Sequence, residues 1–201
     1  FSKANLTIQV ILIDPRMEQN QSTQILLGET QWQWLEAVLN NNKVDLHIVG
    51  SPIQILPHDK PVQECFIHFP QERIRLINLL KNKSALFISG DIHYLELLKM
   101  PTLSKNDETF PLYEFTSSGF THSLSTMTKG LSPLLMPLVR STYTQFQYDS
   151  FNVAKIDVKK VQDGINVSLS YLPISHDRAQ QNKTNWHEII EYHIGEFVNR
   201  E

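Results

Sequence analysis

The chain has 201 residues, of which 41% are hydrophobic and 19% charged, and this composition is typical of a single globular domain. Ten prolines and seven glycines without a repeat exclude a collagen-like chain, and no run of roughly 20 apolar residues is available to cross a bilayer as a helix. The formal net charge of -3 provides no broad basic surface, so we expect no binding of nucleic acid through bulk electrostatics.

Predicted strands and helices alternate in the first half of the chain. In chain order, hydrophobic periodicity predicts a strand over residues 6–13, a helix over residues 30–40 with Thr30 as its N-cap, a strand over residues 44–55, a helix from near Pro70 to Leu80, and a strand over residues 84–89. The last of these is a short apolar run, which is typical of a strand buried on both faces. The alternation predicts an α/β unit.

The second half of the chain is richer in strand signals. A short strand is predicted over residues 112–115, and alternation with β-branched and aromatic residues predicts strands over residues 142–148, 153–158 and 165–171. A short turn containing Asp163-Gly164 joins the last two as an antiparallel hairpin. The final stretch, residues 186–198, is interpreted as a terminal helix. We therefore predict one domain over residues 1–201.

The cysteine content and the possible N-glycosylation sites give evidence on the cellular compartment of the protein. Cys65 is the only cysteine, which excludes an internal disulfide framework and a multi-cysteine zinc site. Five tripeptides, at Asn5, Asn20, Asn82, Asn166 and Asn182, fit the N-glycosylation pattern, where chance gives about two. This excess favours a secreted or lumenal glycoprotein, with a cytoplasmic protein as the alternative. The chain starts without Met or a signal peptide, and a strand is under way by residue 6, so we expect a piece of a longer polypeptide.

Asp91 and His93 follow directly after the buried strand and Gly90. In extended backbone, residues two apart point to the same side, so both groups are expected to aim at one point. A carboxylate oxygen and an imidazole nitrogen together suit divalent and trivalent metal ions. On spacing alone the alternative is that Asp91 caps the following turn and His93 is a surface histidine.

Asp14 and Arg16 form a similar pair at the end of the first strand. If that strand neighbours the strand before Asp91, four polar groups converge on one rim of the sheet. The guanidinium of Arg16 would then suit a phosphate, since its fork donates paired hydrogen bonds. The alternative is a surface ion pair of Arg16 with Asp14 or Glu18.

Two further residues are candidates for supporting roles beside these four. His122 follows the polar loop of residues 116–121, which can bring its imidazole to the rim, and the alternative is a loop histidine satisfied by backbone. Glu96 is placed on the first turn after His93, where it can simply interact with a helix N-terminus.

Five motifs in chain order resemble the alkaline phosphatase D (PhoD-like) metallophosphatases, over about residues 6–172. They are Leu12-Ile13-Asp14-Pro15-Arg16, Leu27-Gly28-Glu29-Thr30-Gln31-Trp32-Gln33-Trp34-Leu35, Phe69-Pro70-Gln71-Glu72-Arg73-Ile74-Arg75-Leu76, Phe87-Ile88-Ser89-Gly90-Asp91-Ile92-His93 and Tyr113-Glu114-Phe115-Thr116-Ser117-Ser118-Gly119-Phe120-Thr121-His122. Each motif is short, and their order along the chain makes the resemblance specific.

The resemblance implies a fold class and a chemistry. The chain would form part of a four-layer α/β/β/α metallophosphoesterase sandwich that ends in an antiparallel hairpin and the terminal helix. In that family a polynuclear metal site, with Ca and Fe in bacterial members, activates a water or hydroxide and polarises a phosphoryl oxygen. By motif, Asp91 and His93 fall on the family's Gly-Asp-x-His metal-site element. Asp14, as a metal ligand, and Arg16, as a phosphate ligand, fall on its Asp-x-Arg element, although Pro15 replaces the more usual Thr.

The sequence departs from the family in one respect, the number of metal ligands that it can supply. The first half of the family's catalytic domain supplies further metal ligands, including acids and an Asn, and nothing in this sequence corresponds to it. We therefore expect the C-terminal portion of a metallophosphatase that needs the missing N-terminal portion, in cis or as an associated chain.

Two classes of function follow from the resemblance and its departure. The first is metal-dependent hydrolysis of a phosphomonoester or phosphodiester substrate. The alternative is a noncatalytic remnant or interaction module that keeps the fold. A lipid- or sugar-directed hydrolase is disfavoured, because no serine nucleophile motif is present.

Overall fold

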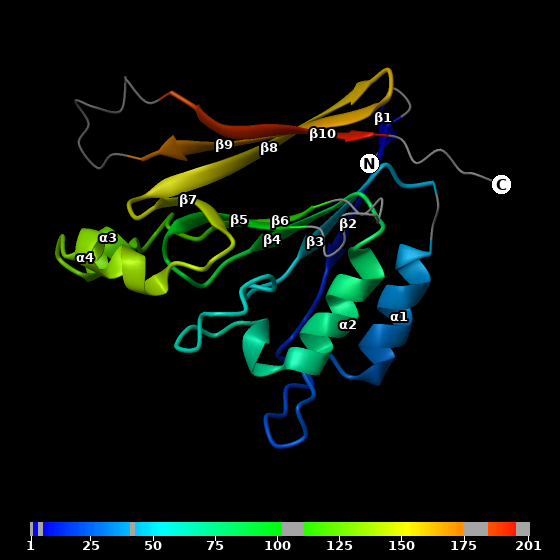
Figure 1. The fold of residues 1–201 in the computed structure, drawn as a ribbon, viewed down its shortest axis with the longest axis horizontal. Helices are drawn as coiled ribbons and strands as arrows, with labels where there is room; N and C mark the ends of the chain where they lie inside the picture. Colours follow the sequence, from blue (N-terminus) through cyan, green and yellow to red (C-terminus); the bar gives the residue numbers. More distant parts are fainter. Residues whose placement is uncertain (1, 4–5, 41–42, 102–110, 175–184, 196–201) are drawn as a thin grey trace.

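The computed structural model describes residues 2–3, 6–40, 43–101, 111–174 and 185–195. They form three layers: helices α1 (Glu29–Leu39) and α2 (Pro70–Leu80), a seven-stranded sheet above them, and a three-stranded sheet above that (Figure 1). These layers confirm the mixed α/β class and the antiparallel C-terminal hairpin, while the complete four-layer sandwich stays a prediction. No helix of the described ranges is long and apolar enough to cross a bilayer.

The seven-stranded sheet has the order β1-β2-β3-β4-β6-β5-β7. Its strands are β1 (Ser2–Lys3), β2 (Leu6–Leu12), β3 (Leu46–Gly50), β4 (Ala85–Ser89), β5 (Leu95–Met100), β6 (Leu112–Ser117) and β7 (Thr144–Tyr148). The strands β2, β3, β4 and β6 are parallel, whereas β1 and β5 run antiparallel to their neighbours. Because β3 lies between β2 and β4, the two predicted site strands share one edge of the sheet but are not adjacent.

Helices α1 and α2 cover one face of this sheet and enclose the larger apolar core. Trp32 and Leu35 of α1 and Leu76 and Leu80 of α2 are almost completely buried there, against apolar side chains of β2, β3 and β4. Both predicted helices are thus confirmed. The N-cap of α1 is Gly28, with φ 73°, rather than Thr30 as predicted, because the chain reverses at Gly28 and the helix already begins at Glu29.

The three-stranded sheet, ordered β10-β9-β8, packs on the other face. It consists of β8 (Asn152–Val161), β9 (Gly164–Pro173) and β10 (His187–Gly195), all antiparallel. The predicted terminal helix is wrong where the structure describes it, since residues 187–195 form a strand paired with β9 along its length. The physical reason is a period of two: Ile190, Tyr192 and Ile194 face the core, and Tyr192 stacks on Tyr113 with ring centroids 4.2 Å apart.

Short elements connect these layers. They are the 3₁₀ turns Phe66–His68 and Met136–Val139 and the single-turn helices α3 (Leu124–Met127) and α4 (Ser132–Leu135).

Of the predicted glycosylation sites, Asn20 and Asn82 are exposed, Asn166 bonds to Glu191 and His193 of β10, and Asn5 and Asn182 lie outside the described residues. Glycosylation and secretion stay predictions.

Candidate functional site

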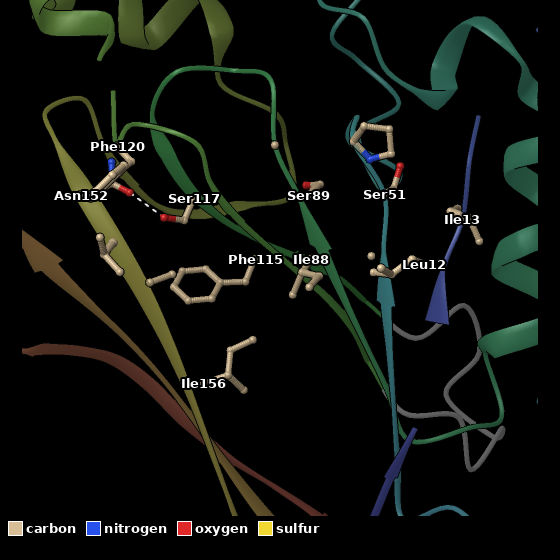
Figure 2. Close-up of a pocket in the computed structure, with 15 residues that line it drawn as sticks. Leu12, Ile13, Ser51, Ile88, Ser89, Phe115, Ser117, Phe120, Asn152 and Ile156 are labelled. Atoms are coloured by element: carbon tan, nitrogen blue, oxygen red, sulfur yellow. Dashed lines mark hydrogen bonds between the residues drawn. The ribbon is translucent and has the colours of Figure 1, made fainter. Parts of the chain in front are cut away.

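The loops that follow β2, β3, β4 and β6 meet at one edge of the seven-stranded sheet, since these four strands are parallel. A cavity of about 820 Å³ lies at this edge, between the two sheets (Figure 2). Its walls are mainly apolar, with the hydroxyl groups of Ser51, Ser89 and Ser117 and the amide of Asn152 as polar groups. Ser117 donates a hydrogen bond of 2.8 Å to Asn152 and so links β6 to β8. Open α/β sheets bind ligands at such edges.

Asp91 and His93 lie in a bent turn between β4 and β5. Their φ angles are 73° and 61°, in the left-handed region, so the extended geometry expected from the sequence is wrong. Ile92 between them is buried at 8% exposure, which leaves Asp91 exposed and His93 half-buried. Left-handed backbone costs an L-residue roughly 1–2 kcal/mol, and such strain concentrates at functional sites. The turn is therefore maintained by its surroundings.

Those surroundings are the loop after β6. The His93 N–H donates to the Ser118 hydroxyl at 2.9 Å, and the Leu124 N–H donates to the His93 carbonyl at 2.8 Å. Ser123 then caps α3 in a reciprocal capping box, which fixes the segment that carries His122. As a result the rings of His93 and His122 lie edge to face, with centroids 6.4 Å apart. The structure thus brings together the predicted residues His93 and His122.

Asp14 and Arg16 lie at the end of β2, on the same edge but in other contacts. The carboxylate of Asp14 accepts hydrogen bonds from the N–H groups of Arg16 and Met17, at 2.9 and 3.2 Å, and so closes its own turn. The guanidinium of Arg16 pairs with Glu64 at 3.0 Å, and both side chains are about half exposed. The sequence-based alternative of a surface ion pair is therefore realised, with Glu64 rather than Asp14 or Glu18 as the partner.

A complete metal site is not formed by the four predicted residues Asp14, Arg16, Asp91 and His93. Within the described ranges, no three His, Cys, Asp or Glu side chains are grouped closely enough to hold a metal ion. Asp91 and His93 offer at most two ligands, and the Asp14 carboxylate already serves its own turn. Because metal affinity depends on ligand number and geometry, these residues do not by themselves fit the implied metal cluster, and no reaction step can be derived from them alone.

Glu96 has a different position from the one predicted. It is in β5 rather than on a helical turn, it is fully buried, and its carboxylate forms an ion pair with Lys60, which is also buried. The other oxygen of the Glu96 carboxylate accepts hydrogen bonds from two residues of β7, Thr144 at 2.7 Å and Gln147 at 2.9 Å. The chain passes directly from the His93 turn into strand β5, which buries Glu96. A buried carboxylate needs a charged or hydrogen-bonding partner. The expected contact with a helix N-terminus is therefore wrong.

Gln54 extends this buried polar cluster toward the rim. Its amide nitrogen donates to Glu96 at 2.8 Å and to the Thr116 hydroxyl at 3.0 Å, while its oxygen accepts from Lys60 at 3.1 Å. The Thr116 hydroxyl is 2.7 Å from that of Ser89, the residue just before Gly90. A continuous chain of hydrogen bonds thus runs from the Lys60–Glu96 pair to the end of β4.

Glu114 ties the loop after β3 to the same strand end. Its carboxylate accepts the N–H groups of Ile55 and Leu56, at 2.9 and 2.7 Å, and also bonds to Ser89. Burial raises the pKa of Glu114 to about 7, against these hydrogen bonds, which lower it. Arg73 of α2 donates to the carbonyl groups of Ile55 and Leu56 from the opposite side. The backbone N–H groups and the carbonyl groups of Ile55 and Leu56 are therefore all hydrogen-bonded, which holds this loop in place.

Sequence reasoning missed this buried cluster. The available signal was a single charged residue inside an otherwise apolar strand, as in Leu95-Glu96-Leu97-Leu98 and Leu112-Tyr113-Glu114-Phe115. A charge in such a run must be paired or hydrogen-bonded, which predicts a buried polar network without naming its partners. Cys65 is buried, and burial raises the pKa of its thiol, which disfavours the reactive thiolate.

Comparison with known proteins gives a fold and no sequence family. No family model matches the chain, and no curated protein matches it in sequence. The solved structure of PhoD is similar to it, with a TM-score of 0.55 and 14% sequence identity. The similarity covers 94% of this chain and 43% of that chain. The chain therefore has a PhoD-like fold and spans less than half the length of the PhoD structure.

Proposed function

We propose that the chain is part of a metal-dependent phosphoric ester hydrolase. The observation that carries the proposal is the position of the Asp91–His93 turn at the carboxyl edge of a sheet whose fold is similar to that of PhoD. The proposal extends the sequence-based resemblance to PhoD-like metallophosphatases, in which a metal site hydrolyses phosphate esters. When bound, the metal ions would supply Lewis-acid activation of the phosphoryl group and of a water molecule.

The residues of this chain have separate tasks in the proposed reaction. Asp91 and His93 would each supply one metal ligand, with His122 beside the His93 ring. Arg16 would orient the substrate phosphate once it leaves Glu64, and an exposed pair costs little to separate. The missing ligands would come from an N-terminal portion of the natural polypeptide, so the activity is proposed for the longest natural form.

A direct assay tests this proposal. The longest natural form is incubated with p-nitrophenyl phosphate and with bis-p-nitrophenyl phosphate, with and without a chelator, and with added Ca²⁺, Fe³⁺, Mn²⁺ or Zn²⁺. Chelator-sensitive turnover is expected, and the preferred ester distinguishes a monoesterase from a diesterase. A folded protein without turnover under any of these metals contradicts the proposal.

Arg16 and Glu64 provide a matched pair of variants for the phosphate role. Glu64→Gln frees the guanidinium of Arg16 and is expected to lower KM, while Arg16→Met is expected to raise KM. Both side chains are exposed, so neither change is expected to unfold the protein. If the two variants keep the same KM as the parent, Arg16 does not hold the phosphate.

A noncatalytic interaction module is the second candidate. The incomplete set of metal ligands in the described part of the chain and the engagement of Arg16 by Glu64 favour it. The two candidates differ in the sequence that precedes Phe1 in the natural polypeptide. Acidic and Asn ligands there favour the hydrolase, and their absence favours the module.

A further inference from the structure

The helical segment between β6 and β7 exposes apolar side chains of the kind that a surface helix normally buries. It comprises α3, α4 and the 3₁₀ turn Met136–Val139, which lie at one end of the molecule (Figure 1). Leu131, Leu134 and Leu138 are 59%, 72% and 80% exposed. Their spacing of three and four residues places them on one face of a helical turn. This leucine face therefore points into solvent.

Polar groups occupy the opposite side of the same segment, where it contacts the rest of the protein. Ser132 is 1% exposed, and its hydroxyl donates a hydrogen bond to the carboxylate of Asp149, just beyond β7. The N–H of Ser125 donates to the Asp149 carbonyl at 3.0 Å. At the far end the Tyr94 hydroxyl donates to the Val139 carbonyl at 3.4 Å. A rotation that buried the leucines would break these bonds, so the fold itself keeps the leucine face exposed.

Two further exposed apolar residues connect, along the chain, the leucine face to the candidate site. Met127 of α3 is 56% exposed, and α3 contacts α4. Phe120, in the loop that leads from β6 to α3, is 65% exposed and lines the cavity (Figure 2). Single exposed apolar residues are ordinary, but a group in one segment indicates contact with another protein or with a membrane. The group is called the apolar patch below and consists of Phe120, Met127, Leu131, Leu134 and Leu138.

The charges around the apolar patch are basic. No Asp or Glu occurs in residues 115–148, whereas Lys129 and Arg140 flank the leucine face at its two ends, and both are exposed. Asp149 and Asp59, which contact the segment or the residues just beyond it, already accept hydroxyl and N–H groups. Exposed leucines between basic residues match the two parts of an anionic lipid surface, its acyl boundary and its negatively charged headgroups.

A protein partner fits the apolar patch less well than a bilayer does. Hot spots of protein interfaces are enriched in Trp, Tyr and Arg, whereas leucine is under-represented, and interfaces carry about one hydrogen bond per 100–200 Å². The apolar patch offers three leucines, a thioether and a phenyl ring, and none of these side chains forms strong hydrogen bonds. The acyl boundary of a bilayer requires no such bonds from the side chains that enter it.

Self-association through the apolar patch is disfavoured by the neighbouring charges. In a two-fold symmetric dimer the patch of one copy lies on the patch of the other. Lys129 and Arg140 would then approach the cations of the other copy, and residues 115–148 contain no carboxylate to pair with them. Like charges that meet in an interface destabilise it. Anionic headgroups avoid this conflict, because they supply negative charge to both ends of the leucine face.

We propose that residues 120–140 dock peripherally on an anionic membrane surface, with the apolar patch at the acyl boundary and with Lys129 and Arg140 among the headgroups. The segment is shorter than a membrane-spanning helix that also needs its ends in water, so it lies in the interface. Because the Leu124 N–H donates to the His93 carbonyl, docking would hold the turn that carries His93 at the membrane surface. The inference goes beyond the proposed hydrolysis and does not depend on it.

Vesicle sedimentation of the longest natural form tests the proposal. The protein is mixed with vesicles of phosphatidylcholine alone or with about one-third phosphatidylserine. Binding to the anionic vesicles is expected, and salt should weaken it by screening the basic residues. Leu134→Ser with Leu138→Ser should lower the vesicle partition coefficient about tenfold or more. Met17→Ser with Val62→Ser is the matched control and should bind as the parent does, because these residues are 81% and 95% exposed outside the segment.

Lys129→Gln with Arg140→Gln tests the electrostatic part of the docking. This variant should lose the preference for anionic vesicles and bind both kinds equally weakly. Equal binding of the parent, the leucine variant and the control overturns the proposal. A parent that binds neither kind of vesicle also overturns it, including the case in which the leucine face instead holds a second copy or another protein.

If the leucine variant fails to fold, an environment-sensitive dye on Leu138→Cys or on Val62→Cys decides the matter, since Cys65 is buried and stays unlabelled. Anionic vesicles should shift the emission of the dye at position 138 to the blue and leave that of the dye at position 62 unchanged. Two unchanged emissions overturn the proposal. Turnover is measured on the same samples: vesicle binding without chelator-sensitive turnover refutes the proposed function alone, and turnover without vesicle binding refutes the docking alone.

Discussion

Lys60 and Glu96 form an ion pair whose side chains are 1% and 0% exposed. Lys60 comes from the loop after β3 and Glu96 from β5, so the pair joins two segments that are far apart in the sequence. Because both charges have lost their hydration, each depends on the other and on Gln54 and Thr144 for compensation.

The first prediction concerns this buried pair. Lys60→Met leaves the Glu96 carboxylate buried without its cation and is expected to lower the free energy of unfolding by about 3–5 kcal/mol. The double variant Lys60→Met with Glu96→Gln is expected to lose less, since the neutral amide can still bond to Thr144. Arg16→Met, which removes an exposed pair, is the control and should cost less than about 1 kcal/mol. Urea unfolding measures all three, and equal losses for Lys60→Met and Arg16→Met contradict the prediction.

The second prediction follows from Glu114. Its pKa is raised from 4.5 to about 7 in the folded chain, so the unfolded chain releases this proton at lower pH than the folded one. The contribution of Glu114 to stability is therefore fully present below pH 4.5 and is lost as the pH rises to about 7. Glu114→Gln keeps the size of the side chain and removes this titration. The difference in unfolding free energy between variant and parent, measured in urea from pH 4.5 to 8, should change over that range, and a constant difference contradicts the assignment.

The third prediction has the opposite sign. Burial, with a smaller effect of the nearby Lys83 charge, lowers the pKa of His47 from 6.5 to about 4. The unfolded chain therefore takes up a proton below pH 6.5 that the folded chain does not take up until about pH 4. The free energy of unfolding is expected to fall as the pH falls across this window. His47→Gln should remove that part of the slope, and NMR titration of the His47 ring should show no midpoint near 6.5.

The sequence predicted most of the larger sheet and both long helices, since their hydrophobic periods are clear. Residues 187–195 were misread because a run of apolar and charged residues near a chain end fits a helix as well as a strand, and only pairing with β9 decides between them. For the site, the sequence identified the edge of the sheet, while the contacts were set by distant partners. Nothing near Arg16 in the sequence indicates Glu64 as its partner, and nothing near Glu96 indicates Lys60.

The fourth prediction separates strain from function at the Asp91–His93 turn. Asn tolerates left-handed backbone at least as well as Asp, so Asp91→Asn should leave the unfolding free energy nearly unchanged at φ 73°. Asp91→Val should lower it by about 1–2 kcal/mol or more, because a β-branched side chain strongly disfavours this conformation. In the longest natural form, however, Asp91→Asn and His93→Ala are each expected to abolish hydrolysis of p-nitrophenyl esters, since each removes a proposed metal ligand.

Unfolding curves and turnover of these variants are therefore read together. An inactive Asp91→Asn protein with parental stability supports a chemical role for the carboxylate, because Asn preserves both the size of the side chain and the turn. Full activity of Asp91→Asn excludes Asp91 as a required ligand. If His93→Ala unfolds the protein, the hydrogen bonds of the His93 backbone to Ser118 and Leu124 do not suffice to hold the turn, and the imidazole has a structural role there.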